Sequence, residues 1–262
     1  MELFINPHIG SRKVTDISRA DIAKLHHDLR GKPYQANRTL GVLSKMFNLA
    51  EVWGLRPDGS NPCRHVKKYK EEKRERFLSD EEYRRLGDAL REIEDEDSET
   101  QSAINAIWLL MLTGCRLNEI MTLKWRFVCL EAGELRLPES KTGAKTVHIG
   151  GAAIDRLKRI ERLDDNEYVI TGKVPGAHLT DLQHPWRRIR KRANLDDVRI
   201  HDLRHSFASR GLLVGEGLPM IGKLLGHTQV QTTARYAHLA SDPVKSAADR
   251  IAEEISETAS SG

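Results

Sequence analysis

The feature that most constrains the fold is an almost uninterrupted apolar segment from Ala103 to Leu112, in which Asn105 is the one polar residue. A helix that is apolar on all sides is normally buried at the centre of a protein. Gly114 follows the segment, as expected where such a helix ends. Because the segment is too short to span a bilayer, we expect a central core helix and no membrane association.

The composition is that of an ordinary globular protein of one large domain, or of one large and one small domain. The chain has 262 residues, of which 39% are hydrophobic, and its beginning does not resemble a secretory signal. The three cysteines, Cys63, Cys115 and Cys129, are odd in number, far apart and outside any C-x-x-C spacing. This pattern indicates neither a disulfide framework nor a zinc site, and it fits a reducing cytoplasm.

The first 76 residues are predicted to form a small helical domain, residues 1–63, followed by a basic interdomain linker, residues 64–76. Two helices are expected between residues 15 and 53, with Ser18 capping the first. The second carries an apolar stripe at helical spacing, made of Leu40, Leu43, Met46, Phe47 and Ala50. The segment 54–76 contains Gly, Pro and many charges but no sustained period, which is typical of a linker.

The remainder, residues 77–262, is predicted to be a second and larger domain. A capping box at Ser79–Glu82 opens a helix to about Asp95, and the central apolar helix follows. Apolar residues alternate on both sides of an S-K-T-G turn within residues 135–149, which predicts a β-hairpin. Beyond Gly150 the pattern indicates only helices, and the last of them covers residues 242–256. The predicted fold class is therefore mainly α with a small β-hairpin or sheet, in two domains.

Two runs of positive charge are candidate contacts for phosphate groups. The net charge of +4 is only mildly basic, so the distribution carries more information than the total. Arg64–Arg76 holds seven Lys or Arg against three Glu, and Arg187–Arg192 holds five cations in six positions. A solvated surface explains each run alone equally well. The candidates are Lys67, Lys68, Lys70, Lys73, Arg74, Arg187, Arg188, Arg190, Lys191 and Arg192.

Two further segments place single cations where they could bind an anion. Arg116 lies in T-G-C-R-L-N-E, directly after the end of the central helix, where its fork of donors and nearby backbone N–H groups could meet a phosphate. A surface pair with Glu119 is the alternative. Lys141 lies in the S-K-T-G turn, where a lysine is more often simply solvated.

Two more segments bring histidines, an arginine and a tyrosine into short motifs. In I-H-D-L-R-H-S-F-A, His201 and Arg204 are three residues apart and so lie on adjoining parts of one helical face. His201 and His205 have the i, i+4 spacing of zinc ligands, but a third ligand and the glutamate of H-E-x-x-H are missing. In L-L-G-H-T-Q-V-Q-T-T-A-R-Y, Tyr236 follows His227 by nine residues. Taken alone, that histidine fits a helix C-cap and that tyrosine a core residue.

Together, the blocks T-G-C-R-L-N-E-I-M-T-L-K-W, H-D-L-R-H-S-F-A-S and L-L-G-H-x(8)-Y resemble the catalytic domain of the tyrosine recombinase (phage integrase) family over about residues 77–240. Their order is that of the family, and a lysine-bearing hairpin lies between the first two. The helix N-R-T-L-x-x-L-S-K-M-F-N-L-A and the turn at Asn61-Pro62 resemble part of the family's core-binding domain. Since the lead-in before these helices is short, we expect that domain to be incomplete.

The resemblance implies a site-specific DNA recombinase in which Tyr236 attacks a backbone phosphate and forms a 3′-phosphotyrosyl link. Arg116, Arg204 and His227 would stabilise the extra negative charge, and Lys141 would protonate the departing 5′-oxygen. His201 would assist proton transfer or hold the site together, oriented by Glu119. The implied chemistry needs no metal, cofactor or ATP.

The resemblance also implies the partners. These are a double-stranded DNA recombination site, further copies of the chain in a homo-tetramer on DNA, and a DNA-bending accessory protein. A mobile-element enzyme of the cytoplasm, associated with the nucleoid, is the expected setting. Two alternatives remain at this point: a type IB topoisomerase with similar chemistry, and a non-catalytic DNA-binding relative, for which the short N-terminus is the main argument.

Overall fold

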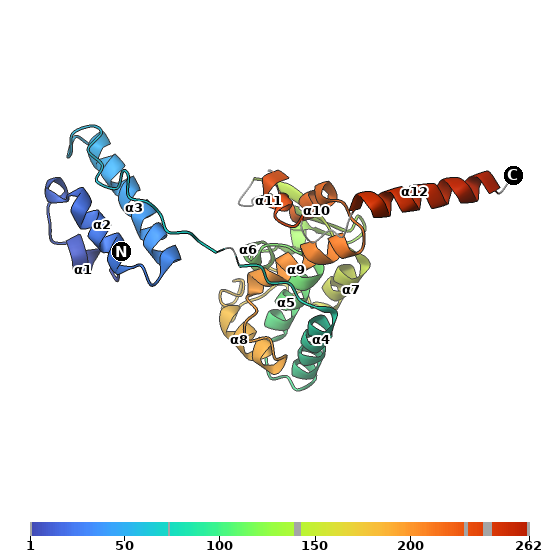
Figure 1. Ribbon diagram of the computed structural model, residues 1–262. Helices are drawn as coiled ribbons and strands as arrows, with labels where there is room; N and C mark the ends of the chain where they lie inside the picture. The colour runs from blue at the N-terminus through green and yellow to red at the C-terminus, as the bar shows by residue number, and fades with distance from the viewer. Residues whose placement is uncertain (1, 73, 139–142, 228–229, 238–242, 261–262) are drawn as a thin grey trace. The chain divides into compact units, whose positions relative to one another are not determined.

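A computed structural model describes residues 2–72, 74–138, 143–227, 230–237 and 243–260 of the chain (Figure 1). It divides the chain into two compact units, Met1–Glu75 and Arg76–Gly262. The two units are treated separately below.

The first unit is a small helical bundle. Its helices are α1 (Asn6–Ile9), α2 (Arg19–Asp28) and α3 (Pro33–Val52), with a 3₁₀ turn η1 (Val14–Asp16). The predicted cap is confirmed, because the Ser18 hydroxyl accepts the backbone N–H of Asp21 and the Asp21 carboxylate accepts that of Ser18. The core of the unit includes Ile22, Leu25, Leu40, Leu43 and Phe47.

Part of the basic segment after α3 is bound to this bundle. The Asn37 side chain donates to the carbonyl of Tyr69 at 2.9 Å and accepts the Tyr69 backbone N–H at the same distance. The Tyr69 ring stacks on His26 with the ring centroids 4.4 Å apart. The cations around Tyr69 are therefore carried on a backbone that α2 and α3 hold in place.

The second unit is mainly helical with one small sheet, which confirms the predicted fold class. Its helices are α4 (Asp80–Asp95), α5 (Gln101–Thr113), α6 (Leu117–Met121), α7 (Gly151–Arg159), α8 (Gln183–Arg192), α9 (Ile200–Leu213), α10 (Leu218–Leu225), α11 (Val230–Ala234) and α12 (Pro243–Ser260), and a 3₁₀ turn η2 spans Trp125–Phe127. The sheet is antiparallel in the order β1 (Val128–Cys129), β2 (Glu134–Leu137) and β3 (Lys145–His148).

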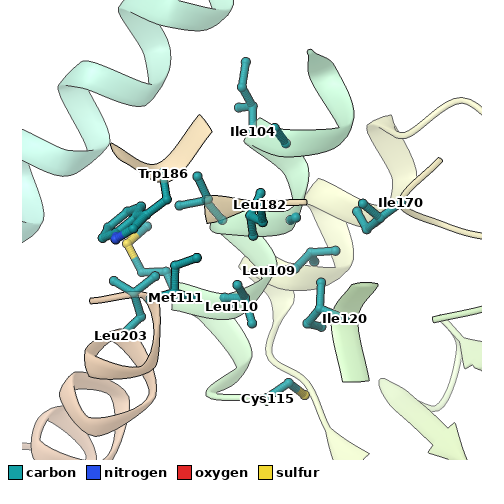
Figure 2. Packing of buried hydrophobic residues seen from close by; sticks show 14 of the residues in the cluster. Ile104, Leu109, Leu110, Met111, Cys115, Ile120, Ile170, Leu182, Trp186 and Leu203 are labelled. Carbon is teal, nitrogen blue, oxygen red and sulfur yellow. The ribbon is translucent and has the colours of Figure 1, made fainter. Parts of the chain in front are cut away.

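Helix α5 forms the centre of the second unit, as its apolar sequence predicts. Its residues Ile104, Ile107 and Leu109 are fully buried. Figure 2 shows side chains of α5 gathered with Trp186 of α8 and Leu203 of α9, in the main hydrophobic cluster of the unit. Each end of α5 is therefore held at a fixed position relative to the helices around it.

The end of α5 is set by Gly114, which adopts a left-handed conformation with φ +62° and caps the helix. A Cβ atom at this position would lie 2.5 Å from the Phe207 ring and 3.1 Å from Leu225. Only glycine satisfies both the backbone conformation and the close packing of α9 and α10 at this point. The chain can therefore turn sharply just before Arg116.

The hairpin prediction is confirmed for the two strands that the structure describes. Leu135 pairs with Val147, and both side chains are buried, as the alternation of apolar residues indicated. The turn that contains Lys141 lies outside the described residues. Strand β1, which pairs Val128 with Leu135, was not expected because it is only two residues long.

The expectation that only helices follow Gly150 is wrong for residues 161–182. This segment forms isolated β-bridges, in which Tyr168 pairs with Lys124 and Thr171 with His178. The Val169 backbone N–H donates to the carbonyl of Leu123 at 2.8 Å. Two of these three partners, Lys124 and Leu123, are distant in the sequence, and a local periodicity does not reveal them.

Among the described residues, no helix is both long enough and apolar enough to cross a membrane.

Candidate active site

The guanidinium of Arg204 on α9 connects the ends of two other helices. It donates to the carbonyl oxygen of Gly114 at 2.6 Å and to that of Leu225 at 2.6 Å. These carbonyls lie at the C-terminal ends of α5 and α10, where unpaired carbonyl groups carry partial negative charge. Arg204 is 4% exposed. Two of its five N–H donors are used in this way, so donors remain to face a bound anion.

A buried carboxylate holds two more cations beside this arginine. Glu119 accepts the backbone N–H of Arg116 at 2.8 Å, the Arg116 guanidinium at 2.8 Å and the Lys145 ammonium at 2.8 Å. The side chain of Glu119 is 5% exposed and that of Lys145 is 10% exposed. Burial alone would raise the pKa of Glu119, but the hydrogen bonds from Lys145 and Arg116 outweigh it and hold that pKa below its usual range.

This geometry argues against one interpretation of Arg116 in the sequence, that of a solvated surface pair with Glu119. The pair with Glu119 exists, but the carboxylate is buried and shared with a lysine from β3, so it is not a solvated surface pair. A shared carboxylate fixes both cations in position while neutralising only one of their two charges. The cluster therefore keeps a net positive charge.

His227 lies at the break after α10, where Gly226 has φ +65°. Its Nδ1 lies 2.8 Å from the Thr233 hydroxyl. Burial, followed by the charges of Arg204, Arg116 and Lys145, lowers the pKa of His227 to about 4. The histidine is therefore neutral near pH 7, and its pKa reflects the surrounding positive potential.

Tyr236 follows α11 and is 2% exposed. Its ring packs edge-on against Phe77 with 6.3 Å between centroids, and its hydroxyl lies 2.5 Å from Nδ1 of His205. Burial raises the pKa of Tyr236, and the charges of Arg235 and Arg204 partly oppose that effect. The hydroxyl is thus protonated near pH 7 and close to a cationic cluster.

His201 lies one turn before His205 on α9. Their rings meet edge to face with 4.8 Å between centroids. Burial and then the Arg204 charge lower the pKa of His201. Of the two histidines that the sequence offers as a zinc pair, His205 packs against Tyr236 and His201 packs against His205. The described residues contain no cluster of three His, Cys, Asp or Glu side chains that could hold a metal ion.

The structure brings most of the predicted site residues into one connected region. Some of these residues are joined by hydrogen bonds, and the others are close enough for their charges to shift one another's pKa. They are Arg116, Glu119, His201, Arg204, His227 and Tyr236. Lys141 lies outside the described residues.

Two residues of this region, Lys145 and His205, were missing from the predicted set. A signal for Lys145 exists in the sequence, because it shares the alternation of Val147 and Ile149 and so projects to the buried face of its strand. The signal for His205 is weaker. Its i, i+4 spacing from His201 indicates that both lie on one helix face, but it does not predict the contact with Tyr236. That contact spans 31 residues and is decided by tertiary packing.

The basic run on α8 is largely engaged within the second unit. Arg188 pairs with Glu99, Arg192 pairs with Glu92 and Glu96, and Arg190 donates to the carbonyl of Val198 at 2.8 Å. Arg187 and Lys191 are exposed, as are Lys67, Lys68, Lys70 and Arg74 of the first run, whereas Lys73 is not described.

The arrangement suits chemistry in which negative charge develops on an oxygen. Fixed guanidinium and ammonium groups in a partly buried pocket stabilise such charge without having to reorganise during the reaction. A tyrosine hydroxyl beside them is a potential nucleophile.

A model of the phage integrase family matches residues 76–242 of this chain, which is most of its length. The chain therefore belongs to the phage integrase family.

One similar protein matches most of the chain. A shufflon-specific DNA recombinase of Escherichia coli is 31% identical over 248 residues, which are 88% of this chain and 60% of the recombinase. The chain thus spans about 60% of the length of that relative.

Solved structures share the fold. A lambda integrase dimer bound to a COC′ core site has a TM-score of 0.68 at 20% identity and covers 88% of this chain and 83% of its own. A lambda integrase tetramer bound to a Holliday junction has a TM-score of 0.62 at 21% identity, with 82% of this chain and 65% of the other covered.

We predict that Lys145→Met lowers the free energy of unfolding by roughly 2 kcal/mol, because Glu119 then loses one charged hydrogen-bond donor in a buried position. Urea denaturation at pH 7 measures the change. Lys158→Met, which removes an exposed lysine on α7, is the matched control.

The pH dependence gives this prediction a second criterion. The pKa of Glu119 is lower in the folded chain than its ordinary value of 4.5, so the carboxylate contributes stability above pH 4.5 that is lost as pH falls through the folded pKa. The difference between the wild type and Lys145→Met should therefore shrink below pH 4.5. A difference no larger than that of the control at pH 7 would contradict the buried ion cluster.

Proposed function

We propose that this chain is a site-specific DNA recombinase that cuts and rejoins strands through Tyr236. The observation that carries the proposal is a buried tyrosine whose pKa is influenced by the charge of Arg204, a guanidinium held by two helix ends. The charges of Arg204 and of Arg116, which is fixed with Lys145 on one carboxylate, also influence each other. The recombination activity named for the shufflon relative and the DNA complexes of the lambda integrase support the same function.

In the proposed cleavage step, the Tyr236 oxygen attacks a backbone phosphorus and the bond from phosphorus to the 5′-oxygen breaks. The products are a 3′-phosphotyrosyl link and a free 5′-hydroxyl. Arg116 and Arg204 stabilise the extra charge on the non-bridging oxygens. When the Thr233 hydroxyl donates to Nδ1 of His227, the hydrogen of that histidine is on Nε2, and we assign this N–H to the same oxygens.

Protonation of the leaving 5′-oxygen is assigned to Lys141 in the hairpin turn, and His201 assists proton transfer. The covalent link keeps the energy of the phosphodiester, so a 5′-hydroxyl from another strand can reverse the step without ATP. No step requires a metal ion, because the charge of the transition state is met by side chains.

The decisive experiment is recovery of DNA that becomes covalently attached to the protein. We expect wild-type protein incubated with sheared genomic DNA in EDTA to form adducts that survive SDS, whereas Tyr236→Phe, which lacks the nucleophilic oxygen, forms none. Sequencing of the attached DNA gives the cleavage site. Tyr34→Phe, which changes an exposed tyrosine of the first unit, is the matched control.

The outcomes separate the candidate functions. Adducts at one recurring sequence support a recombinase, and scattered adducts would indicate a topoisomerase. Protein that binds DNA but forms no adduct would point to a non-catalytic relative.

We further propose that the first unit, as a core-binding domain, contacts the DNA backbone through the cations around Tyr69. Lys67, Lys68 and Lys70 are exposed and lie on a backbone that is bound to α2 and α3. On α8, only Arg187 and Lys191 remain as strong candidates, because the other arginines are paired within the unit.

Changing Lys67, Lys68 and Lys70 together to Gln should therefore flatten the salt dependence of DNA binding. If each lysine neutralises one phosphate, the slope of log K against log salt decreases by about 0.9 per lysine, or about 2.7 in all. Fluorescence anisotropy on one duplex across a salt series measures the slope. The exposed set Lys158, Arg159 and Lys173 changed to Gln is the control, and an unchanged slope in the first variant would reject the assignment.

Assembly on DNA is proposed to proceed through α12. The helix exposes Ile251 by 61% and Ile255 by 63%, one turn apart, so an apolar stripe faces solvent in the single chain. A second copy of the chain is the proposed occupant, in a tetramer on two recombination sites. The lambda integrase tetramer on a Holliday junction supports this state.

We expect the double variant Ile251→Glu with Ile255→Glu to bind DNA but to form smaller complexes than wild type. Sedimentation velocity on a duplex carrying the recovered cleavage sequence measures protomers per duplex, and Glu253→Gln with Glu254→Gln is the exposed control. One wild-type protomer per duplex at saturation would overturn the tetramer.

A further inference from the structure

One contact of the nucleophile is left without a role by the proposed mechanism. The Tyr236 hydroxyl lies 2.5 Å from Nδ1 of His205, which is a short distance for a hydrogen bond. His205 comes from α9 and Tyr236 from the segment after α11, so two separate elements bring them together. The contact is therefore a feature of the folded site and not of a local sequence motif.

The protonation states allow the tyrosine to be the donor in this hydrogen bond. Burial is the largest cause that lowers the pKa of His205 to about 4, followed by the charges of His201, Arg235 and, with a smaller effect, Arg204, while Asp202 opposes them. The imidazole is neutral near pH 7, and the raised pKa of Tyr236 keeps its hydroxyl protonated. In the tautomer with its hydrogen on Nε2, Nδ1 of His205 is free to accept the hydrogen of the tyrosine.

We infer that His205 takes the proton of Tyr236 as the tyrosine attacks the phosphate, an inference that rests on the proposed function. The Tyr236 oxygen forms a bond to phosphorus, its proton moves to Nδ1 of His205, and the bond to the 5′-oxygen breaks. The imidazole then carries protons on both nitrogens. In the rejoining step the same proton returns to the tyrosine oxygen as it leaves.

The surroundings of the hydroxyl support this assignment. The other described ring contacts of Tyr236 are the edge of Phe77 and the guanidinium of Arg235, and neither can accept a proton. The carboxylate of Glu119 already accepts three donors from Arg116 and Lys145. Nδ1 of His205 is therefore the group in contact with the hydroxyl that can accept its proton.

Proton transfer is coupled to attack and does not precede it. Before attack, the tyrosine holds its proton far more tightly than His205 would. As the bond to phosphorus forms, the oxygen becomes an ester oxygen and loses its affinity for the proton. His205 therefore acts only along the reaction path, and the resting enzyme keeps a neutral, unreactive nucleophile.

His205→Asn is the test variant, because an amide oxygen can accept the hydrogen bond of Tyr236 but cannot take its proton. We expect covalent cleavage of a nicked duplex carrying the recovered site to slow by roughly 100-fold, at the lower end of general acid–base effects. His148→Asn, at an exposed position on β3, is the matched control.

A fluorinated tyrosine at position 236 supplies a readout that a structural role would not move. Its hydroxyl loses the proton more readily, so it needs the base less, and it should recover about tenfold or more of the rate lost in His205→Asn. In the chain with His205 intact, it should change the rate little.

Cleavage in D₂O gives a second measurement that requires no substitution at position 205. The substrate for this measurement carries sulfur in place of the leaving 5′-oxygen, and the thiolate departs without a proton donor. A solvent isotope effect on the cleavage rate that remains therefore reports the transfer of the Tyr236 proton. The fluorinated tyrosine should reduce that effect.

The results distinguish this inference from the function on which it rests. Wild-type protein that forms no adduct would remove both. If the wild type is active and His205→Asn is equally active, only the role of His205 as proton acceptor is overturned. The same holds if the variant is slow and the fluorinated tyrosine does not rescue it.

Discussion

The two hydrogen bonds from Arg204 to the carbonyls of Gly114 and Leu225 hold the candidate active site together. A buried guanidinium needs several acceptors, and the ends of α5 and α10 supply them in the form of carbonyls with partial negative charge. The same contacts determine where the chain goes next, because Arg116 follows two residues after Gly114 and His227 follows two residues after Leu225. One buried arginine thereby sets the positions of the two segments that face it, and the left-handed glycines after both helices permit the sharp turns.

The electrostatics of the site follow from an excess of cations around one carboxylate. Glu119 neutralises one charge where Arg116, Lys145 and Arg204 supply three, and the positive potential contributes to the low pKa of the nearby His227. A neutral histidine has one donor nitrogen and one acceptor nitrogen, whereas a protonated histidine has two donors and no acceptor. An array of fixed cations of this kind favours an anion and stabilises developing negative charge without reorganising.

The sequence predicted elements and residues where local physics decides the outcome. The apolar run of α5, the capping boxes at Ser18 and Ser79 and the alternation in β2 and β3 each depend on neighbours within a few positions, and each prediction is confirmed. The prediction failed for residues 161–182, where bridges to Lys124 and within the segment replace a helix. On α8, the run of arginines suggested a free basic surface, but glutamates from α4 and the loop before α5 pair with two of them.

The sequence by itself determined the family and the residue types of the chemistry, because three motifs with fixed internal spacing carry the arginines, histidines and tyrosine. Tertiary structure alone decided which of them touch. Lys145 meets Glu119 across 26 residues, Arg204 meets Gly114 across 90, and His205 meets Tyr236 across 31. Such contacts depend on how α5, α9 and α10 pack around a common core, and packing is a property of the whole unit that no local pattern of residues records.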